Sequence, residues 1–222
     1  MGAVFDIDVV VPYLPDLASG LWVTFRLGVI SVALGVVLGL LLALARLSGT
    51  RLLAWPAYLY IELFRTTPPL VQIIWFYYGL PPLTGIELDP FGAAALALGL
   101  NIAAFFAEIF RAGVEAVPAT QWQAAKVLGL GRLDTLRSVI LPQAARLVLP
   151  PTGTTVIYLV KGTALASAIG APELLRVGQL VALETFRPVE VLTVIAIAYF
   201  VLTYPIALAF MALERRVARA RA

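Results

Sequence analysis

Few side chains in this 222-residue sequence could take part in chemistry, and several of them stand inside long apolar stretches. These candidates are Glu62, Arg65, Gln72, Glu108, Lys161 and Thr163. The chain contains no cysteine and no histidine, which excludes thiolate and imidazole metal sites and a histidine base. A charge at the centre of a bilayer costs on the order of 2.5–3.5 kcal/mol on insertion scales. Groups of this kind should therefore face the protein interior and pair with each other or with a charged solute.

A second group of charges lies in residues 118–142, which we call the bracket. It includes Lys126, Arg132 and Arg137. Thr120 and Gln123 have the spacing of a capping box, which predicts a helix start at Thr120. Gly129 is expected to end that helix, because glycine readily adopts the left-handed conformation that helix ends use.

Apolar residues recur at helical spacing in the second half of the bracket, at Leu133, Leu136 and Ile140. Pro142 is expected to mark the entry to the next element. The pattern thus predicts two short helices joined by residues 129–131 and lying outside the membrane. An ordinary amphipathic loop is the alternative interpretation.

The composition places these residues in an all-α integral membrane protein. The chain is 61% hydrophobic, with a mean hydropathy of +0.95 and only 13% charged residues, whereas soluble domains average about 25% charged residues. We expect one transmembrane domain, residues 1–222, with about five transmembrane helices, since each needs roughly 20 apolar residues. The expected spans are residues 17–47, 52–80, 91–113, 143–163 and 188–211. Gly28, Gly35 and Gly39 give the first span a small face suited to close packing.

The second span is unusual because Pro68 and Pro69 interrupt it. Proline frees backbone carbonyls, which a bilayer tolerates only where protein or a water-filled cavity covers them. A broken span that carries charges is typical of a substrate path in transporters. Glu62 and Arg65 could instead form a structural pair one helical turn apart, and Arg65 could pair with Glu108 on the third span.

The distribution of positive charge predicts the orientation. If the N-terminus lies outside, the inner segments hold eleven cations: Arg46, Arg51, Arg111, Lys126, Arg132, Arg137, Arg146, Arg215, Arg216, Arg219 and Arg221. The outer segments hold two, Arg176 and Arg187. The positive-inside rule then places the bracket and the C-terminus in the cytoplasm. Residues 164–187 are too polar for a full span and are expected to form one or two short helices at the outer face.

The bracket resembles a loop of the permeases of ABC importers. Gln123-Ala124-Ala125, Gly129 and Val139-Ile140-Leu141-Pro142 are similar to that family's E-A-A-(three)-G-(nine)-I-x-L-P motif. Gln123 stands where the family usually has Glu, so a salt bridge made there is lost, and Val139 stands in place of Ile. Further segments resemble the polar amino acid branch (histidine, glutamate, glutamine, arginine and opine type): Ser19–Thr24, Tyr60–Leu70, Glu108–Gly113 and Lys161–Leu165, with Thr66 replacing Gly and Gly162 and Ala164 replacing Asp and Ser.

The resemblance implies a type I importer permease in the bacterial inner membrane. Such a permease forms the pathway for a polar amino acid delivered by an external solute-binding protein. It works with two ATPase subunits and a second permease subunit, which is a second copy or a paralogue. The implied coupling helix, which docks on the ATPase, involves Gln121, Trp122, Gln123, Ala124, Ala125, Lys126, Gly129 and Gly131. The pathway would involve the six candidates named first, since an amino acid carries both a carboxylate and an ammonium to pair with them.

The sequence itself also indicates that ATP is hydrolysed by a separate subunit. No G-x-x-x-x-G-K-[ST] phosphate-binding motif occurs, so ATP and Mg²⁺ are expected on the partner and no cofactor on this chain. An ion-coupled carrier or channel, with Glu62, Glu108 and Lys161 as coupling groups, is the alternative function. A membrane-embedded enzyme is a third class, but Glu62 and Glu108 lie on different spans and have no visible nucleophile.

The predicted orientation can be tested with single cysteines, because the chain has none of its own. Cysteines placed singly at Glu87, Lys126 and Arg219 should react with an impermeant thiol reagent added outside intact cells only at position 87. Labelling of position 126 from outside would reject the orientation.

Overall fold

The computed structural model describes residues 5–219, which are almost entirely helical and contain no strand. This confirms the expected all-α fold. In chain order the helical segments are η1 (Ile7–Tyr13), α1 (Leu14–Leu47), α2 (Arg51–Thr66), α3 (Pro69–Ile74), η2 (Trp75–Gly79), α4 (Leu80–Thr84), α5 (Pro90–Glu115), α6 (Ala119–Val127), α7 (Arg132–Thr135), η3 (Leu136–Ile140), α8 (Leu141–Gly162), η4 (Thr163–Ile169), α9 (Leu174–Thr185) and α10 (Pro188–Arg219). Arg221, counted above among the inner cations, lies outside the described residues.

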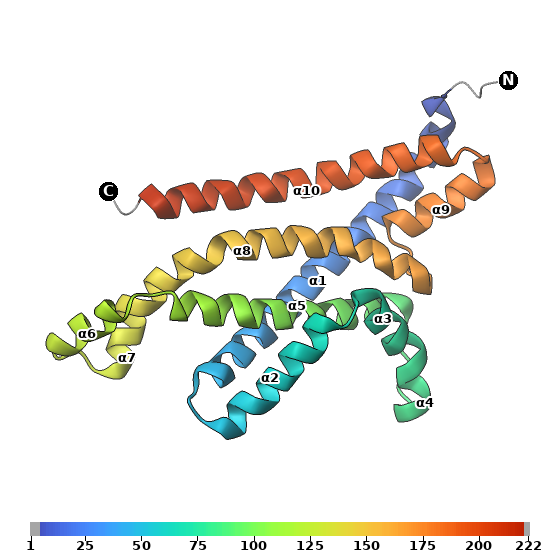
Figure 1. The fold of residues 1–222 in the computed structure, drawn as a ribbon. Coiled ribbons are helices and arrows are strands. Elements are labelled where there is room, and N and C mark those ends of the chain that lie inside the picture. Colours follow the sequence, from blue (N-terminus) through green and yellow to red (C-terminus); the bar gives the residue numbers. More distant parts are fainter. Residues whose placement is uncertain (1–4, 220–222) are drawn as a thin grey trace.

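The central element is α5, which contacts α1, α2, α3 and α8 (Figure 1). Its start is set by Asp89, whose side chain accepts a hydrogen bond from the Gly92 amide at 3.1 Å, and by Pro90 in the first turn. Much of α5 is buried alanine, so neighbouring helices approach its backbone closely on several sides. Phe106, Leu98 and Ile102 supply the larger side chains of the core.

The crossing of α1 over α5 depends on small residues. A Cβ atom added to Gly35 would lie 2.2 Å from the Ile102 side chain, and one added to Gly39 would lie 2.7 Å from the Phe106 Cβ. Both glycines therefore lie at positions where α5 leaves no room for a side chain. The sequence-based expectation of a small packing face on α1 is confirmed at these two glycines.

Not every predicted span is a single helix. Among the described residues, three helical segments are each long and apolar enough to cross a membrane: Ile7–Leu47, Pro90–Glu115 and Pro188–Val217. The segment Arg132–Ile169 and α9 pass the same test together, bent by 52°. Residues 52–80 contain a break between α2 and α3, so the predicted second span is not one continuous helix.

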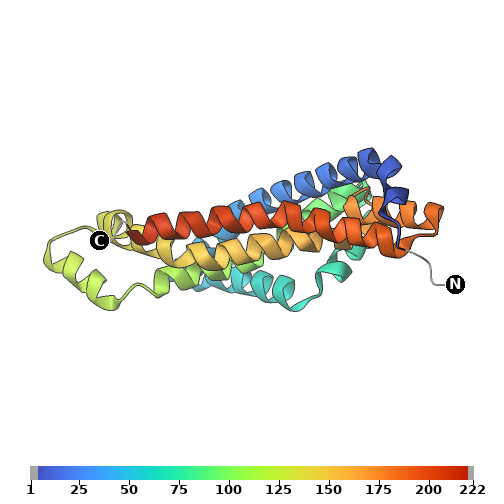
Figure 2. The same cartoon turned by 90° about the horizontal axis from the view of Figure 1, so that it is seen from above.

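The bracket lies at the end of the bundle where α10 ends, and the segment η1 lies at the other end (Figure 2). The predicted second short helix of the bracket is not separate, because α7 continues through η3 into α8. Pro142 therefore lies within a continuous helical segment and does not begin a new one. Pro142 lies just after the wider turn η3, where the regular helical hydrogen-bond pattern is already altered.

Near the N-terminal end, Glu173 joins three helices. Its buried carboxylate accepts from the backbone amide of Arg176 at 2.7 Å and from the Tyr199 hydroxyl at 2.9 Å. The neighbouring amide of Leu174 donates to the Thr24 hydroxyl of α1 at 3.0 Å. Residues 164–187 thus form η4 and α9, the short helices that were predicted, and α9 is fixed against α1 and α10.

The crossing of α1 and α5 yields a stability prediction. Gly39→Ala should lower stability by about 1–3 kcal/mol, because the new methyl group would collide with Phe106 and the Ala103 carbonyl. Gly28→Ala is the matched control on the same helix, since its new Cβ would meet only the Val160 side chain at 3.4 Å. Thermal unfolding of the purified chain in detergent should show a drop for Gly39→Ala alone. Equal melting temperatures for the two variants would contradict this packing.

Candidate functional site

The break between α2 and α3 is the first feature of the site. In a continuous helix the Phe64 carbonyl would accept the amide hydrogen of residue 68. Residue 68 is proline, which has no amide hydrogen, so this carbonyl loses its partner. Asn101 of α5 donates its side-chain amide to the Phe64 carbonyl at 2.7 Å, and Gln72 of α3 donates to the same oxygen at 3.0 Å.

These two amides hold the broken helix in place. Gln72 also donates to the Thr67 carbonyl at 3.2 Å and to the Thr67 hydroxyl. Both Gln72 and Asn101 are buried, with 7% and 5% of their surfaces exposed. Gln72, predicted as a pathway residue, thus has its amide nitrogen occupied by backbone, and only its buried Oε1 atom is without a partner among the described residues.

A cavity of about 300 Å³ lies beside this break, between α3, α5, α8 and η4. It is lined by Pro69, Leu98, Asn101, Ile102, Phe105, Thr154, Thr155, Tyr158, Leu159, Gly162 and Leu165. The lining is mainly apolar and contains a few polar groups, which is the usual composition of a small-molecule site. Sequence reasoning missed Asn101 and Tyr158, although an asparagine in an alanine-rich run and a tyrosine at the end of a span were visible signals.

Two predicted pathway residues, Lys161 and Thr163, flank a lining residue in the sequence but do not line the cavity themselves. Thr163 is fully buried, and its hydroxyl donates to the Val160 carbonyl at 2.7 Å. Lys161 is exposed, and no ion pair with another described residue forms at its ammonium. Between them, Gly162 contributes to the cavity wall. Lys161 is therefore the cation nearest in sequence to this cavity, and it has no counter-ion among the described residues.

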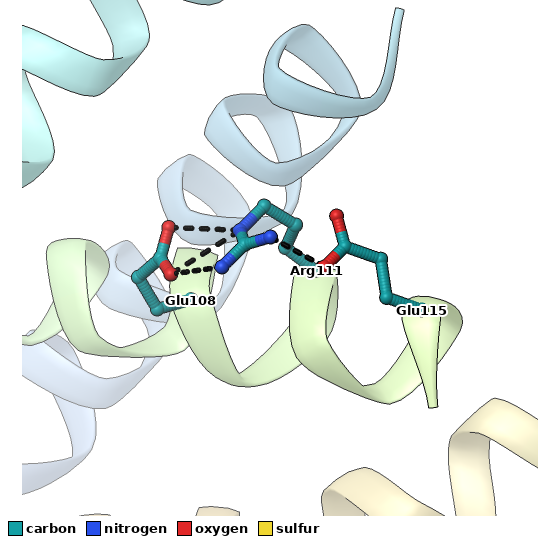
Figure 3. Close-up of polar contacts among 3 residues, drawn as sticks. All are labelled: Glu108, Arg111 and Glu115. Carbon is teal, nitrogen blue, oxygen red and sulfur yellow. Dashed lines mark hydrogen bonds and ion pairs between the residues drawn. The ribbon is translucent and has the colours of Figure 1, made fainter. Parts of the chain in front are cut away.

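The cluster at the bracket end of α5 is ionic (Figure 3). Arg111 reaches Glu108 with its Nη2 atom at 2.7 Å and its Nε atom at 3.1 Å, and its Nη1 atom reaches Glu115. The three residues are spaced at helical intervals on α5, so one helix supplies the whole network. The side chains of Glu108 and Arg111 are 21% and 24% exposed, which leaves them partly accessible.

Neither ion pair considered for Arg65 occurs among the described residues. Glu108 pairs with Arg111, whose position three residues along the same helix requires no approach between two helices. Arg65 instead lies over the ring of Phe105, with its Cζ atom 5.6 Å from the ring centroid, a cation–π contact. Glu62 is half-buried one turn before it on α2 and makes no ion pair there.

The start of the bracket differs from the prediction. Helix α6 begins at Ala119 with Pro118 as its N-cap residue, and no side chain caps it. Thr120 is therefore already inside the first turn, where its hydroxyl is not placed to cap the helix, and the predicted capping box with Gln123 is wrong. The rigid ring of Pro118 sets the chain direction two residues earlier.

The predicted end of α6 is confirmed. Gly129 has a left-handed backbone with φ of +75°, and its amide donates to the Lys126 carbonyl at 3.1 Å. The next amide, of Leu130, donates to the Ala125 carbonyl at 3.0 Å. These two bonds form a Schellman motif, which satisfies the last carbonyls of α6 and reverses the chain.

The faces of the bracket are not those that the sequence suggested. Ala125 is 2% exposed, so its side chain packs within the chain and cannot contact a partner directly. Trp122 is half-buried and packs beside Val117 and Ile140. The large exposed apolar side chains are instead Val127, Leu128 and Leu133, at 86%, 77% and 76% exposure. We call these three residues the bracket tip; sequence reasoning missed them because it assigned the contact surface from motif positions alone.

Comparison with known proteins gives consistent results. A family model described as "Binding-protein-dependent transport system inner membrane component" matches residues 35–220. The L-cystine transport system permease protein TcyB of Bacillus subtilis (strain 168) is 38% identical over 206 residues, which cover 92% of this chain and 88% of that protein. The glutamine transport system permease protein GlnP of Escherichia coli (strain K12) is 37% identical over 213 residues, covering 96% and 97% respectively.

Solved structures agree with these relatives. A crystal structure of an amino acid ABC transporter with histidines matches with a TM-score of 0.91 and 37% identity, and the match covers 96% of this chain and 100% of that chain. The MetNI methionine ABC transporter matches with a TM-score of 0.77 at 23% identity, which supports the fold alone. The expected all-α permease fold is confirmed, and the three long apolar helices and one bent pair are roughly consistent with the expected number of spans.

The amide clamp on the Phe64 carbonyl predicts a stability effect. Asn101→Leu keeps the side-chain size but removes a donor from a carbonyl that Pro68 cannot serve. It should cost about 1–3 kcal/mol, because the carbonyl then depends on the Gln72 amide nitrogen alone, whose two hydrogens are shared with the Thr67 carbonyl and hydroxyl. Thermal unfolding in detergent would measure this loss.

Tyr60→Phe is the matched control, because the Tyr60 hydroxyl also donates across α2 and α5, to the Leu100 carbonyl at 2.9 Å. That carbonyl lies inside α5 and keeps its helical partner, so the control should lose less stability than Asn101→Leu. An equal or larger loss for Tyr60→Phe would contradict the clamp.

Proposed function

This chain belongs to the family of binding-protein-dependent transport system inner membrane components, and from that premise we propose that it imports a polar amino acid as the permease subunit of an ATP-driven transporter. The single observation that carries the proposal is the match along nearly the whole chain, at a TM-score of 0.91, to a solved amino acid ABC transporter. The relatives named for cystine and glutamine transport support the same substrate class.

In this function the chain forms part of the transmembrane pathway for the amino acid, and another subunit hydrolyses ATP. No phosphate-binding loop occurs in the sequence, so ATP and Mg²⁺ would bind a pair of ATPase subunits. A second permease subunit would complete the pathway, since about five helices are few to enclose one alone. A solute-binding protein would deliver the amino acid on the outer side. The bacterial inner membrane, with the N-terminus outside and the bracket inside, is the matching location.

The cavity beside the helix break is the proposed pathway element in this subunit. A zwitterionic amino acid needs a cation for its carboxylate and an anion or acceptor for its ammonium. Asn101 and Tyr158 line the cavity, and Lys161, next in sequence to the lining residue Gly162, has no ion-pair partner in the described chain. Glu62 and Arg65 lie on α2 just before the break, and Glu108 lies further along α5. We assign these four charged residues to the pathway, with the Glu108–Arg111 pair acting as a fixed ionic element.

The bracket tip is the proposed ATPase contact. This surface is apolar and exposed at the end of α6 and the start of α7, where it comprises Val127, Leu128 and Leu133. Such a surface suits a helix that binds in a groove of a partner protein. Trp122 and Ala125 would not contact the ATPase directly. Their side chains would instead hold α6 against α7 and η3. Gln121, Gln123, Ala124, Lys126 and Gly131 complete the proposed coupling surface.

The test is to purify the chain with the ATPase and binding protein encoded beside it and to measure ATP hydrolysis with single amino acids. The proposal expects one or a few polar amino acids, presented by the binding protein, to stimulate hydrolysis. Uptake driven by a proton or sodium gradient without any ATPase would reject it and favour the ion-coupled carrier.

The same assay tests the bracket. Gly129→Val forces a β-branched residue into a left-handed backbone, although nothing lies within 4 Å of the new Cβ. The strain should be relieved by unwinding the end of α6, which displaces the bracket tip. We expect substrate-stimulated ATP hydrolysis to fall about tenfold or more while the permease still inserts, as a misplaced interface anchor often loses 2 kcal/mol.

Gly85→Val is the matched control. Gly85 has nearly the same backbone, with φ of +73° and open space around its Cβ, but it ends α4, away from the bracket. It carries the same strain outside the bracket and should leave hydrolysis near the wild-type level. Equal losses in both variants would mean that general backbone strain, and not the bracket, limits hydrolysis.

A further inference from the structure

A groove that the proposed import cycle does not use lies between the end of α1 and the start of α2. It has a volume of about 630 Å³ and is lined by Arg46, Arg51, Leu52, Ala54, Trp55 and Tyr58. We call it the α1–α2 groove. Two arginines, two aromatic rings and two aliphatic side chains thus meet at one turn of the chain.

The charge of Arg46 is not neutralised within the described chain. Its Nε atom is buried without a hydrogen-bond partner, and none of the ion pairs among the described residues includes Arg46. Its guanidinium lies over the Tyr58 ring, with 5.0 Å between the Cζ atom and the ring centroid. The Glu108 carboxylate acts on Arg46 only through space, because Glu108 pairs directly with Arg111. A partly buried cation in this state favours an anion from outside the chain.

The start of α2 adds to this positive potential. Arg51 is the first residue of α2 and is exposed. No side chain caps the helix, and the Thr50 hydroxyl instead lies 2.8 Å from the Ser48 hydroxyl. The first-turn amides and the positive end of the helix dipole therefore point toward the same turn as the two arginines. This combination suits a phosphate group, which accepts several hydrogen bonds at once.

The remaining lining residues suit a lipid better than a free anion. Leu52 and Trp55 lie one turn apart on α2 and are 85% and 66% exposed. Tryptophan is enriched at membrane interfaces, where its ring sits at the level of the headgroups. The groove also lies at the bracket end of the bundle, because Leu47 and Ser48 beside it share another cleft with Trp122 and Arg132.

From these contacts we infer that the α1–α2 groove binds the headgroup of an anionic phospholipid. The phosphate contacts Arg46, Arg51 and the start of α2, and the acyl chains lie along Leu52 and Trp55. Basic pockets between membrane helices recognise anionic headgroups in this way. The inference concerns a lipid site on this permease and does not depend on which solute it carries.

Native mass spectrometry of the full chain in detergent tests the inference, with phosphatidylglycerol and phosphatidylcholine as probes. Wild-type protein should retain phosphatidylglycerol in preference to phosphatidylcholine. The double variant Arg46→Gln/Arg51→Gln should bind phosphatidylglycerol about 25-fold more weakly, since each basic residue near an anionic surface contributes about a factor of five. Phosphatidylcholine binding should not change.

Arg215→Gln/Arg216→Gln is the matched control, because it removes two exposed cations from the same end of the bundle. It should keep the wild-type affinity. Arg51→Gln alone is a second test, because Arg51 is exposed and its loss should not disturb folding; an intermediate loss of affinity is expected.

Three results would overturn the inference. One is equal phosphatidylglycerol binding in the Arg46/Arg51 variant and in the Arg215/Arg216 control. Another is displacement of phosphatidylglycerol by millimolar inorganic phosphate, which would show a site for a free anion. The third is loss of ATPase or permease assembly in the Arg46/Arg51 variant with unchanged lipid binding, which would assign the groove to an acidic protein partner.

Discussion

The structure depends on one constraint, that a backbone carbonyl inside a membrane protein must find a donor within the protein. Pro68 removes the donor that the Phe64 carbonyl would have in a continuous helix. Asn101 and Gln72 replace it, one from α5 and one from α3. Because α5 is held against α1 through Gly35 and Gly39, the break is fixed to the most closely packed part of the bundle. The cavity beside the break can then keep a defined shape without a continuous second span.

Sequence reasoning identified the break but not its chemistry. Two adjacent prolines within an apolar run show that a helix must be interrupted, and this holds whatever surrounds them. Which side chains serve the released carbonyl depends on which residues of another helix lie opposite, and no local spacing encodes that. Asn101 was therefore missed, and Gln72 was assigned to the pathway although its amide nitrogen binds backbone. The Glu108–Arg111 pair was within reach of sequence reasoning, because a spacing of three residues on one helix already brings the two side chains together.

The bracket shows the same division between local and tertiary information. The end of α6 was predictable because a left-handed residue at a helix end is a local requirement, and Gly129 meets it. The start was not, since Pro118 directs the chain before Thr120 could cap it. The burial of Trp122 and Ala125 depends on how α6 packs on η3 and α8, so motif positions alone could not separate supporting residues from the exposed Val127 and Leu128.

The continuity from α7 to α8 connects the bracket to the cavity. A helical segment runs without interruption from Arg132, beside the bracket tip, to Tyr158 and Gly162, which line the cavity. A helix carries a displacement along its axis where successive turns are hydrogen-bonded to one another. Pro142, Pro150 and Pro151 each remove one of these bonds from α8, and the wider turn η3, at Leu136–Ile140, changes the regular pattern just before it. A partner that moved the bracket tip would therefore act on the cavity wall through α8, with η3 and these prolines setting how much of that motion becomes bending.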